Sequence, residues 1–207
     1  MKDSISPLDG RYSSETEELL PYFSERALIR YRIKVEIEYL IALSKEKTLV
    51  GLPAFTKKQE ATYRKIYSNF NASTAKEVKK VEQRTNHDVK AVEYYIRSKI
   101  NKSIHPWVHF ALTSEDVNNL SYTLMWRDAL KKVYIPQLTQ VLKDLKTLSN
   151  KYANTAMLSM THGQPATPTT FGKEIRVFVN RIERQINGID KHKFLGKFGG
   201  ATGTWSA

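Results

Sequence analysis

The sequence predicts an all-α protein, in which a small N-terminal helical domain precedes the first long helices of a helical bundle. Three observations support this fold class. Apolar residues recur at spacings of three and four along most of the chain, which is the period of an amphipathic helix. Gly and Pro are scarce, with 9 and 7 of 207 residues, and strand-like alternation is hard to find. Residues that cap helix N-termini precede several of the apolar stripes.

Residues 1–106 are expected to form the N-terminal helical domain. Its first helix follows Ser24, a candidate N-cap, and carries an apolar stripe that runs from Ile29 to Leu40. A later helix is predicted to begin close to the residues TNHD at 85–88.

Two capping-box patterns mark the starts of helices between these two. Thr56 pairs with Gln59, and Thr74 pairs with Glu77. In each pair, the side chain of the first residue is expected to accept a backbone N–H of the helix. The side chain of the second residue is expected to accept the backbone N–H of the first residue.

Residues 107–207 are expected to supply the first, truncated part of the bundle domain. An apolar stripe starts within residues 113–119 and continues to Val133, Pro136 then kinks or interrupts it, and it resumes as far as Tyr152. Stripes of this length predict long helices that pack nearly parallel in a bundle. We place the boundary between the two domains in the polar segment that ends at residue 106.

The last helix is predicted from the apolar stripe between Phe171 and Ile189. Thr167 is its predicted N-cap and Pro168 its predicted first residue, where a missing N–H costs nothing. The chain then ends in a Gly-rich stretch, residues 194–207, without a closing helix. We therefore expect the sequence to be part of a longer protein.

Composition limits the classes of function. The chain has 41% hydrophobic and 26% charged residues, no apolar run of membrane-spanning length and no apolar leader segment, which together favour a cytosolic protein without a membrane partner. Cys is absent, which excludes disulfides, thiolate catalysis and Cys-based zinc sites. The net charge of +12 is spread along helical segments, so nucleic acid is not the expected partner. Nucleotide-binding and serine-hydrolase motifs are also missing.

Four polar loops carry the candidate chemistry, namely Asp9–Tyr12, Thr85–Asp88, Thr113–Asp116 and Thr161–Pro165. The last three lie at or directly before predicted helices, whose free N–H groups and positive dipole ends suit carboxylate or phosphate. With Arg11 able to grip an oxyanion through two N–H bonds, the loops indicate an anionic small-molecule ligand. The alternative is that these residues only cap helices, and this is the better explanation for Thr113–Asp116 taken alone.

His87 and His162 each lie in one of these loops before a predicted helix. The positive end of a helix dipole favours the neutral imidazole, which could then transfer a proton near pH 7. For either histidine alone, a ring bound to a backbone carbonyl is the simpler explanation. His105 and His109 have the spacing of a zinc pair, but without a third ligand they predict packing or capping and no metal site.

At these loops the sequence resembles the adenylosuccinate lyases of bacterial type, within the aspartase/fumarase superfamily. The segments that carry the resemblance are SPLDGRY, RTNHDVKAVEYYI, HFALTSEDVNNLSYTLM and HGQPATPTTFGKE, which extend from Ser6 to Glu174. The resemblance implies an all-α homotetramer with a shared helical bundle. It also implies a cofactor-free β-elimination that releases fumarate from adenylosuccinate, giving AMP, and from SAICAR, giving AICAR, in purine biosynthesis.

The resemblance also implies roles for individual residues. His162 matches the general acid that protonates the leaving nitrogen, and His87 matches the second active-site histidine, which assists substrate binding. The positions that match substrate contacts are Arg11, Tyr12, Asn86, Asp88, Thr113 and Ser114.

The family's proton-abstracting serine lies in a loop of pattern S-S-x-M-P-x-K-x-N, and no segment of this chain matches that pattern. The chain corresponds to about the first half of such an enzyme, and we expect it to be inactive alone. Two other functions stay open, which are another fumarate-releasing lyase of the superfamily and a non-catalytic basic helical interaction module.

Overall fold

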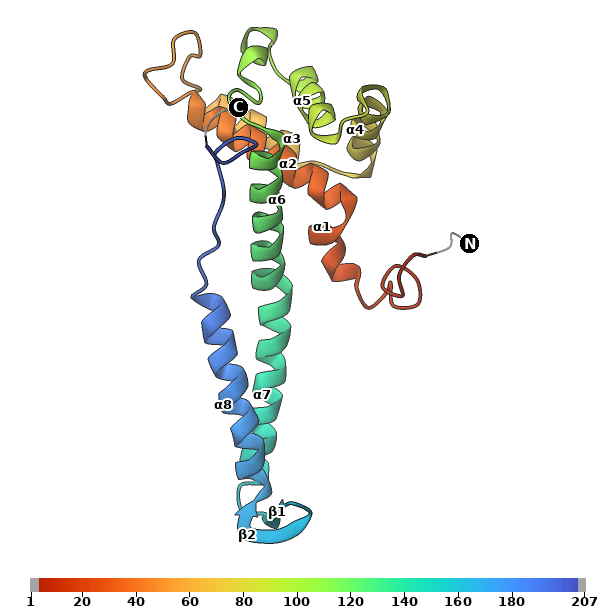
Figure 1. Cartoon of the computed structure of the whole chain (residues 1–207), viewed down its shortest axis with the longest axis vertical. Helices are drawn as coiled ribbons and strands as arrows, with labels where there is room; N and C mark the ends of the chain where they lie inside the picture. The colour runs from red at the N-terminus through yellow and green to blue at the C-terminus, as the bar shows by residue number, and fades with distance from the viewer. Residues whose placement is uncertain (1–3, 205–207) are drawn as a thin grey trace. The chain divides into compact units, whose positions relative to one another are not determined.

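The computed structural model describes residues 4–204, which form two compact units. The first unit contains the chain up to Arg127 together with the segment from Leu195 onward, and the second unit contains Asp128–Phe194 (Figure 1). The domain boundary predicted between residues 106 and 107 stays a prediction, and the segment before it forms a short 3-10 helix inside the first unit.

Helices account for all the regular structure of the first unit among the described residues. In chain order they are η1 (Glu17–Leu19), α1 (Leu20–Phe23), α2 (Glu25–Leu43), α3 (Lys57–Ser68), α4 (Ala72–Thr85), α5 (Asp88–Lys99), η2 (Lys102–Trp107) and α6 (Ser114–Ala129). The core between them is built mainly from α2 and α5, with Ile33, Ile37, Val92 and Ile96 fully buried.

The predicted caps are confirmed for two of these helices. The Ser24 hydroxyl accepts the N–H of Ala27 at 3.1 Å, and Thr56 forms a capping box with Gln59. The prediction for α4 was wrong by one turn.

In α4, Asn71 is the N-cap and Thr74 is the N3 residue that returns a hydrogen bond to the Asn71 N–H at 2.7 Å. Both residue types cap helices well, so the local pattern could not decide between them. The start at Asn71 gives α4 an additional turn, whose Ser73 and Thr74 N–H groups donate to the Asn71 side chain.

The second unit contains a π-helical segment η3 (Leu130–Tyr134), helix α7 (Ile135–Lys151), a hairpin of β1 (Ala156–Thr161) and β2 (Gln164–Thr170), and helix α8 (Phe171–Asp190). The wider π turn directly precedes Pro136, in agreement with the predicted interruption, because proline offers no N–H to the preceding turn. Leu142 from α7 packs against Ile175 and Val179 from α8 to form a separate small core.

The hairpin was not predicted, since no strand alternation is evident in the sequence. β1 and β2 pair antiparallel with a bulge between Leu158 and Met160. The turn that joins the strands has positive φ at both central residues, 50° at His162 and 74° at Gly163, which is the backbone of a type I′ turn. The all-α fold class is nevertheless confirmed, because this hairpin is the only sheet within residues 4–204.

The predicted start of the last helix was wrong. Thr167 and Pro168 lie in β2, where Pro168 is the register partner of Leu158. Helix α8 begins at Phe171, and its N-cap is Thr170, whose hydroxyl accepts the N–H of Lys173 at 3.2 Å.

The end of α7 and the start of α8 approach each other closely at the base of the hairpin. The Gly172 N–H donates to the Tyr152 carbonyl at 2.9 Å, and the Ser149 hydroxyl donates to the Gly172 carbonyl at 2.8 Å. A Cβ on Gly172 would overlap the Ser149 carbonyl oxygen and lie 2.7 Å from the backbone N of Ala153. Only glycine fits this contact.

Candidate functional site

The residues TNHD at 85–88 form the joint between α4 and α5. Asn86 ends α4 in the left-handed conformation, with φ 49°, which asparagine tolerates better than most residues. His87 is the N-cap of α5, because its Nδ1 accepts the N–H of Lys90 at 3.2 Å. Asp88 is the first residue of α5, and its Oδ1 accepts the N–H of Val89 at 2.9 Å. These side chains therefore occupy N–H groups that the sequence predicted to be free for an anion.

The hydrogen bond at Nδ1 also determines the protonation of Nε2, the other nitrogen of the His87 ring. A neutral imidazole that accepts at Nδ1 carries its proton on Nε2, which makes Nε2–H a hydrogen-bond donor. The side chain is 49% exposed, so this donor is accessible to a ligand. In this tautomer His87 can bind an anionic oxygen and orient it, whereas proton abstraction would require it to give up the cap.

An open depression of about 650 Å³ lies beside this joint. Its lining residues come from the last two turns of α4 and from the joint itself, and they are Lys79, Glu82, Gln83, Asn86, His87 and Asp88. The spacing of three and four from Lys79 through Asn86 places these α4 side chains on one face, a signal that the sequence did contain. Lys79 pairs with Glu25 at 2.6 Å and with Glu82 at 3.0 Å, so this wall carries both charges.

Arg32 of α2 contacts the same joint and was missed by the sequence prediction. It is 5% exposed, its Nη2 lies 2.6 Å from Oδ2 of Asp88, and its Nε donates to Oδ1 of Asn118 at 2.9 Å. Partial burial opposes ionisation of Asp88, but the Arg32 charge and the Val89 N–H outweigh it and hold the pKa of Asp88 below its usual value. The sequence did contain an indication of this buried residue, because Arg32 directly precedes Ile33 of the apolar stripe of α2.

Thr113 and Ser114 lie at the start of α6. The N–H and hydroxyl of Thr113 both donate to Oδ2 of Asp116, at 2.9 and 3.0 Å. The other oxygen of Asp116 accepts the N–H of Gly199 at 3.0 Å and the Lys197 ammonium at 3.1 Å. Burial of Asp116 favours the protonated form, but the Gly199 and Thr113 N–H groups and Lys197 outweigh it, so its pKa is held well below the usual range. Asp116 therefore caps the start of α6 through the Thr113 N–H, which is one part of the capping role predicted for this loop.

Arg11 and Tyr12 occupy a turn that precedes η1. The Tyr12 N–H donates to the Pro7 carbonyl at 2.9 Å, and the Arg11 guanidinium lies 5.5 Å from the centre of the Tyr12 ring. Figure 1 shows this segment extending away from α4 and α5. The structure thus brings Asn86, His87 and Asp88 to one depression, and it does not bring Arg11 and Tyr12 to it.

His162 lies in the second unit, at the tip of the β1–β2 hairpin, and is exposed. The prediction that it directly precedes a helix was wrong, because β2 separates it from α8. Its positive φ is unusual for a residue other than glycine, although histidine adopts it more readily than most. The turn therefore presents the ring at the end of a paired, two-stranded arm.

His105 and His109 have separate partners, although their spacing is that of a zinc pair. His105 Nε2 lies 3.4 Å from the Ile100 carbonyl, and His109 Nδ1 lies 2.5 Å from Oε1 of Glu36. Within the described residues, no group of three His, Asp or Glu side chains is arranged to hold a metal ion.

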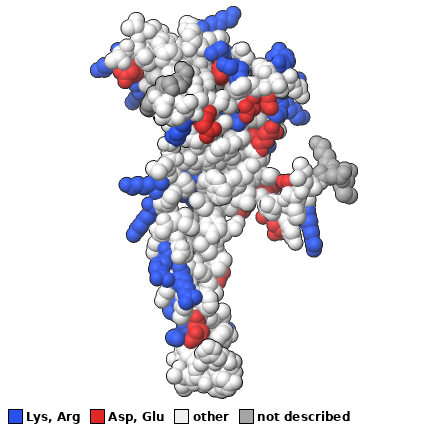
Figure 2. Space-filling view, viewed as in Figure 1, with Lys and Arg blue, Asp and Glu red and all other residues white. Residues whose placement is uncertain are grey.

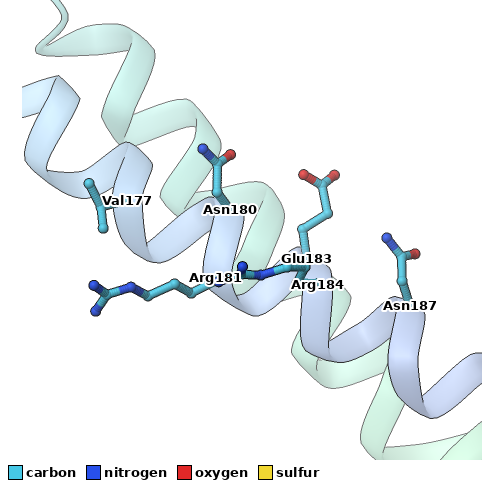
Figure 3. A pocket seen from close by; sticks show the side chains of 6 residues that line it. All are labelled: Val177, Asn180, Arg181, Glu183, Arg184 and Asn187. Atoms are coloured by element: carbon cyan, nitrogen blue, oxygen red, sulfur yellow. The ribbon is translucent and has the colours of Figure 1, made fainter.

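A second depression, of about 520 Å³, lies on α8 alone (Figure 3). Its lining residues are Val177, Asn180, Arg181, Glu183, Arg184 and Asn187. Because one helix supplies every wall, this surface lacks the convergent groups that a small-molecule site needs. Figure 2 shows mainly basic side chains on the visible side of the α8 region, whereas acidic and basic side chains mix over the first unit.

No helix within residues 4–204 is both long and apolar enough to cross a membrane.

Comparison with known proteins relates the chain to one enzyme family. A family model described as lyase matches residues 10–207. The chain is 44% identical over 210 residues to the adenylosuccinate lyase of Legionella pneumophila (strain Corby), with 99% of this chain and 46% of that protein covered. Identity is 46% over 213 residues to the adenylosuccinate lyase of Dictyostelium discoideum and 38% over 209 residues to that of Escherichia coli (strain K12). The chain thus spans about half the length of these curated relatives.

Solved structures share the fold at lower identity. A fumarate lyase from Mesorhizobium sp. BNC1 superposes with a TM-score of 0.72 at 19% identity, covering 92% of this chain and 44% of that one. A β-carboxy-cis,cis-muconate cycloisomerase from Acinetobacter calcoaceticus sp. ADP1 gives a TM-score of 0.68, also at 19% identity and with the same coverage. At this identity the likeness extends to the fold alone.

Proposed function

Because this chain belongs to the lyase family, we propose that it forms part of an adenylosuccinate lyase. The whole enzyme would release fumarate from adenylosuccinate, giving AMP, and from SAICAR, giving AICAR, in purine biosynthesis. The observation that carries this proposal is the 38–46% identity to adenylosuccinate lyases across 99% of the chain. The helix N–H groups next to His87 and Asp88 are taken by these two side chains, but the Nε2–H of His87 offers a donor to a substrate that carries a phosphate and two carboxylates.

The proposed reaction is a β-elimination without a cofactor. A base removes the proton on the carbon next to a carboxylate, the carbon–nitrogen bond breaks, and an acid protonates the departing nitrogen. We assign the acid to His162, which is exposed at the hairpin tip where a substrate can reach it. The base is assigned to a serine of the signature loop, for which these 207 residues contain no matching segment.

The proposed role of His87 is to bind and orient the substrate. Its Nε2–H is available as a donor while its Nδ1 caps α5, a geometry that supports binding of an anionic oxygen better than proton abstraction. The further proposed substrate contacts are Arg11, Tyr12, Asn86, Asp88, Thr113 and Ser114. For Arg11 and Tyr12 this proposal requires a rearrangement of the segment before η1, since that turn lies apart from α5 (Figure 1).

The proposed assembly is a homotetramer in the cytoplasm, with no nucleic-acid or membrane partner. Large apolar side chains on both long helices of the second unit support self-association, since Val141 of α7 is 48% exposed and Phe178 of α8 is 58% exposed.

The chain alone is expected to be inactive, because it has an acid but no assigned base. Purified as 207 residues, it should not cleave adenylosuccinate in an ultraviolet absorbance assay. The longest natural form of the protein should cleave it, and His162→Ala should lower that rate by about 100-fold or more, the contribution of a positioned general acid. His192→Ala is the matched control, because His192 is an exposed histidine of the same unit.

Three other outcomes would each contradict part of this proposal. Turnover by the 207-residue chain well above its His162→Ala variant would contradict the proposed inactivity. Cleavage of another fumarate-releasing substrate, but of neither succinyl compound, would indicate a different lyase of the superfamily. Salt-sensitive nucleic-acid binding without lyase activity in any form would indicate a basic interaction module.

A further inference from the structure

Arg32 is a charged residue inside the first unit. It lies on α2 beside Ile29 and Ile33, both of which belong to the apolar core, and it is only 5% exposed. A buried guanidinium is costly unless its charge and N–H groups are paired, so its partners indicate what it does.

Both partners of Arg32 lie at or near helix starts. The guanidinium reaches Asp88, the first residue of α5, through Nη2 at 2.6 Å. Through Nε it reaches Asn118, in the first two turns of α6, at 2.9 Å. One planar group thus fixes the start of α5 relative to α6.

The contact extends from Asp88 to His87. Oδ2 of Asp88 faces Arg32 while Oδ1 accepts the Val89 N–H at 2.9 Å, so a single carboxylate joins the buried cation to the first turn of α5. His87 caps the same turn through the Lys90 N–H at 3.2 Å. Its ring nitrogen keeps this bond only while the first turn stays in place.

We propose that Arg32 is a positioning residue that, through Asp88, fixes the first turn of α5 and with it the orientation and tautomer of the His87 ring. The consequence for substrate binding rests on the proposed lyase function. The consequence for the geometry of His87 does not rest on it.

The local effect can be measured on the 207-residue chain. In Arg32→Met, amide hydrogen exchange at Lys90 and Ala91 should become at least ten-fold faster. Nitrogen-15 spectra of the His87 ring should change from one tautomer, protonated at Nε2, to a mixture of two. Arg26→Met is the matched control, since Arg26 is an exposed arginine of the same helix, and it should change neither signal.

The effect on the reaction is measured on the longest natural form of the protein. Arg32→Met should raise KM about ten-fold and lower kcat about ten-fold, because the substrate-orienting donor of His87 is no longer held. Arg32→Lys should recover part of the loss, since an ammonium can pair with Asp88 but does not reproduce the planar fork that also reaches Asn118. Arg26→Met should keep both constants.

Asp88→Asn is the second variant, for use if Arg32→Met does not fold. It weakens the Arg32–Asp88 pair by changing Asp88, which is half-exposed, and leaves the buried Arg32 in place. It should also accelerate exchange at Lys90 and Ala91. Folded variants of either kind with unchanged exchange and an unchanged His87 tautomer would overturn the proposal. An unmodified protein without lyase activity would refute the proposed function, while the exchange and tautomer measurements would still test the role of Arg32.

Discussion

His109 lies between two buried glutamates of the first unit. Its Nδ1 is 2.5 Å from Oε1 of Glu36, and its Nε2 is 3.8 Å from Oε1 of Glu93. Glu93 is also paired with Lys90 at 2.9 Å and Arg97 at 3.6 Å, whereas His109 is the only basic side chain paired with Glu36 within residues 4–204. The free energy of unfolding should therefore depend on whether the His109–Glu36 pair is protonated.

Both members of this pair keep protons to higher pH than they would in an unfolded chain. Burial raises the pKa of Glu36, an effect that its hydrogen bond with His109 only partly offsets. Burial lowers the pKa of His109, but the hydrogen bond and charge of Glu36 outweigh this, so the net pKa is raised. A raised folded-state pKa contributes stability that is fully present at low pH and is lost as pH rises through the folded-state value.

We expect the free energy of unfolding to fall between about pH 4, below the ordinary pKa of Glu, and about pH 8.5, above the ordinary pKa of His, as the pair loses its protons, at about 1.4 kcal/mol for each unit of pKa displacement. Replacing both residues, as Glu36→Gln with His109→Gln, should flatten this dependence. Urea unfolding at the two pH values measures it. His105→Gln is the control and should keep the slope, since the His105 ring lies against the Ile100 backbone carbonyl, at 3.4 Å, rather than against a carboxylate. An equal slope in the double variant would exclude the pair as its source.

Single residues show where sequence reasoning reaches its limit. Asn86, His87 and Asp88 were identified as candidates because they share one short polar loop. Arg32 and Glu36 were not, because their partners lie 56 and 73 positions away along the chain, at Asp88 and His109. Pairing over such a separation is a property of the folded core, which local patterns do not encode.

The start of α8 provides a test at the scale of one element. Thr170→Ala removes the hydroxyl that caps the helix and should lower the free energy of unfolding by about 1 kcal/mol, the usual cost of losing an N-cap. Thr167→Ala should have a smaller effect, since the Thr167 hydroxyl makes only a long contact of 3.4 Å with the exposed Ser159 hydroxyl, and the shorter bond from Ser159 goes to the Thr167 backbone carbonyl. Urea unfolding of both variants measures the difference. The reverse order of effects would place the N-cap at Thr167, as the sequence alone predicted.

The error at α8 has a physical cause. Thr167 followed by Pro168 is a strong local signal for a helix start, but pairing with β1 holds both residues extended. A hairpin gains its stability from cross-strand contacts, so propensities read along one segment underestimate it. The long helices were predictable because their apolar stripes repeat over several turns, and each repeat adds to the signal.

The exposed apolar residues of α7 and α8 lead to a prediction for the whole molecule. Phe178 is 58% exposed on α8, and Val141 on α7 is 48% exposed. We expect the chain to self-associate through this surface, because burial of such side chains removes apolar area from water. Sedimentation velocity should show a sedimentation coefficient that rises with concentration, and Phe178→Glu should weaken association at least ten-fold.

Val50→Glu is the control for self-association. Val50 is 92% exposed, but it lies in the loop between α2 and α3 of the first unit. If Val50→Glu weakened association as much as Phe178→Glu, the loss would come from the added charge and not from the α7–α8 surface. A chain that remains monomeric at every concentration would remove the support that the exposed helices give to a homotetramer.

The glycine contact at the base of the hairpin has a mechanical consequence for the proposed acid. A six-residue strand such as β1 is about 20 Å long, so the hairpin acts as a lever that moves His162 by about 0.35 Å for each degree of tilt at its base. Catalytic groups must stay within about 0.5 Å of their working position, which allows little more than one degree. The close packing of Gly172 against the end of α7 would then limit how far the hairpin can tilt. The position of the His162 ring therefore depends on Gly172, at the opposite end of the hairpin.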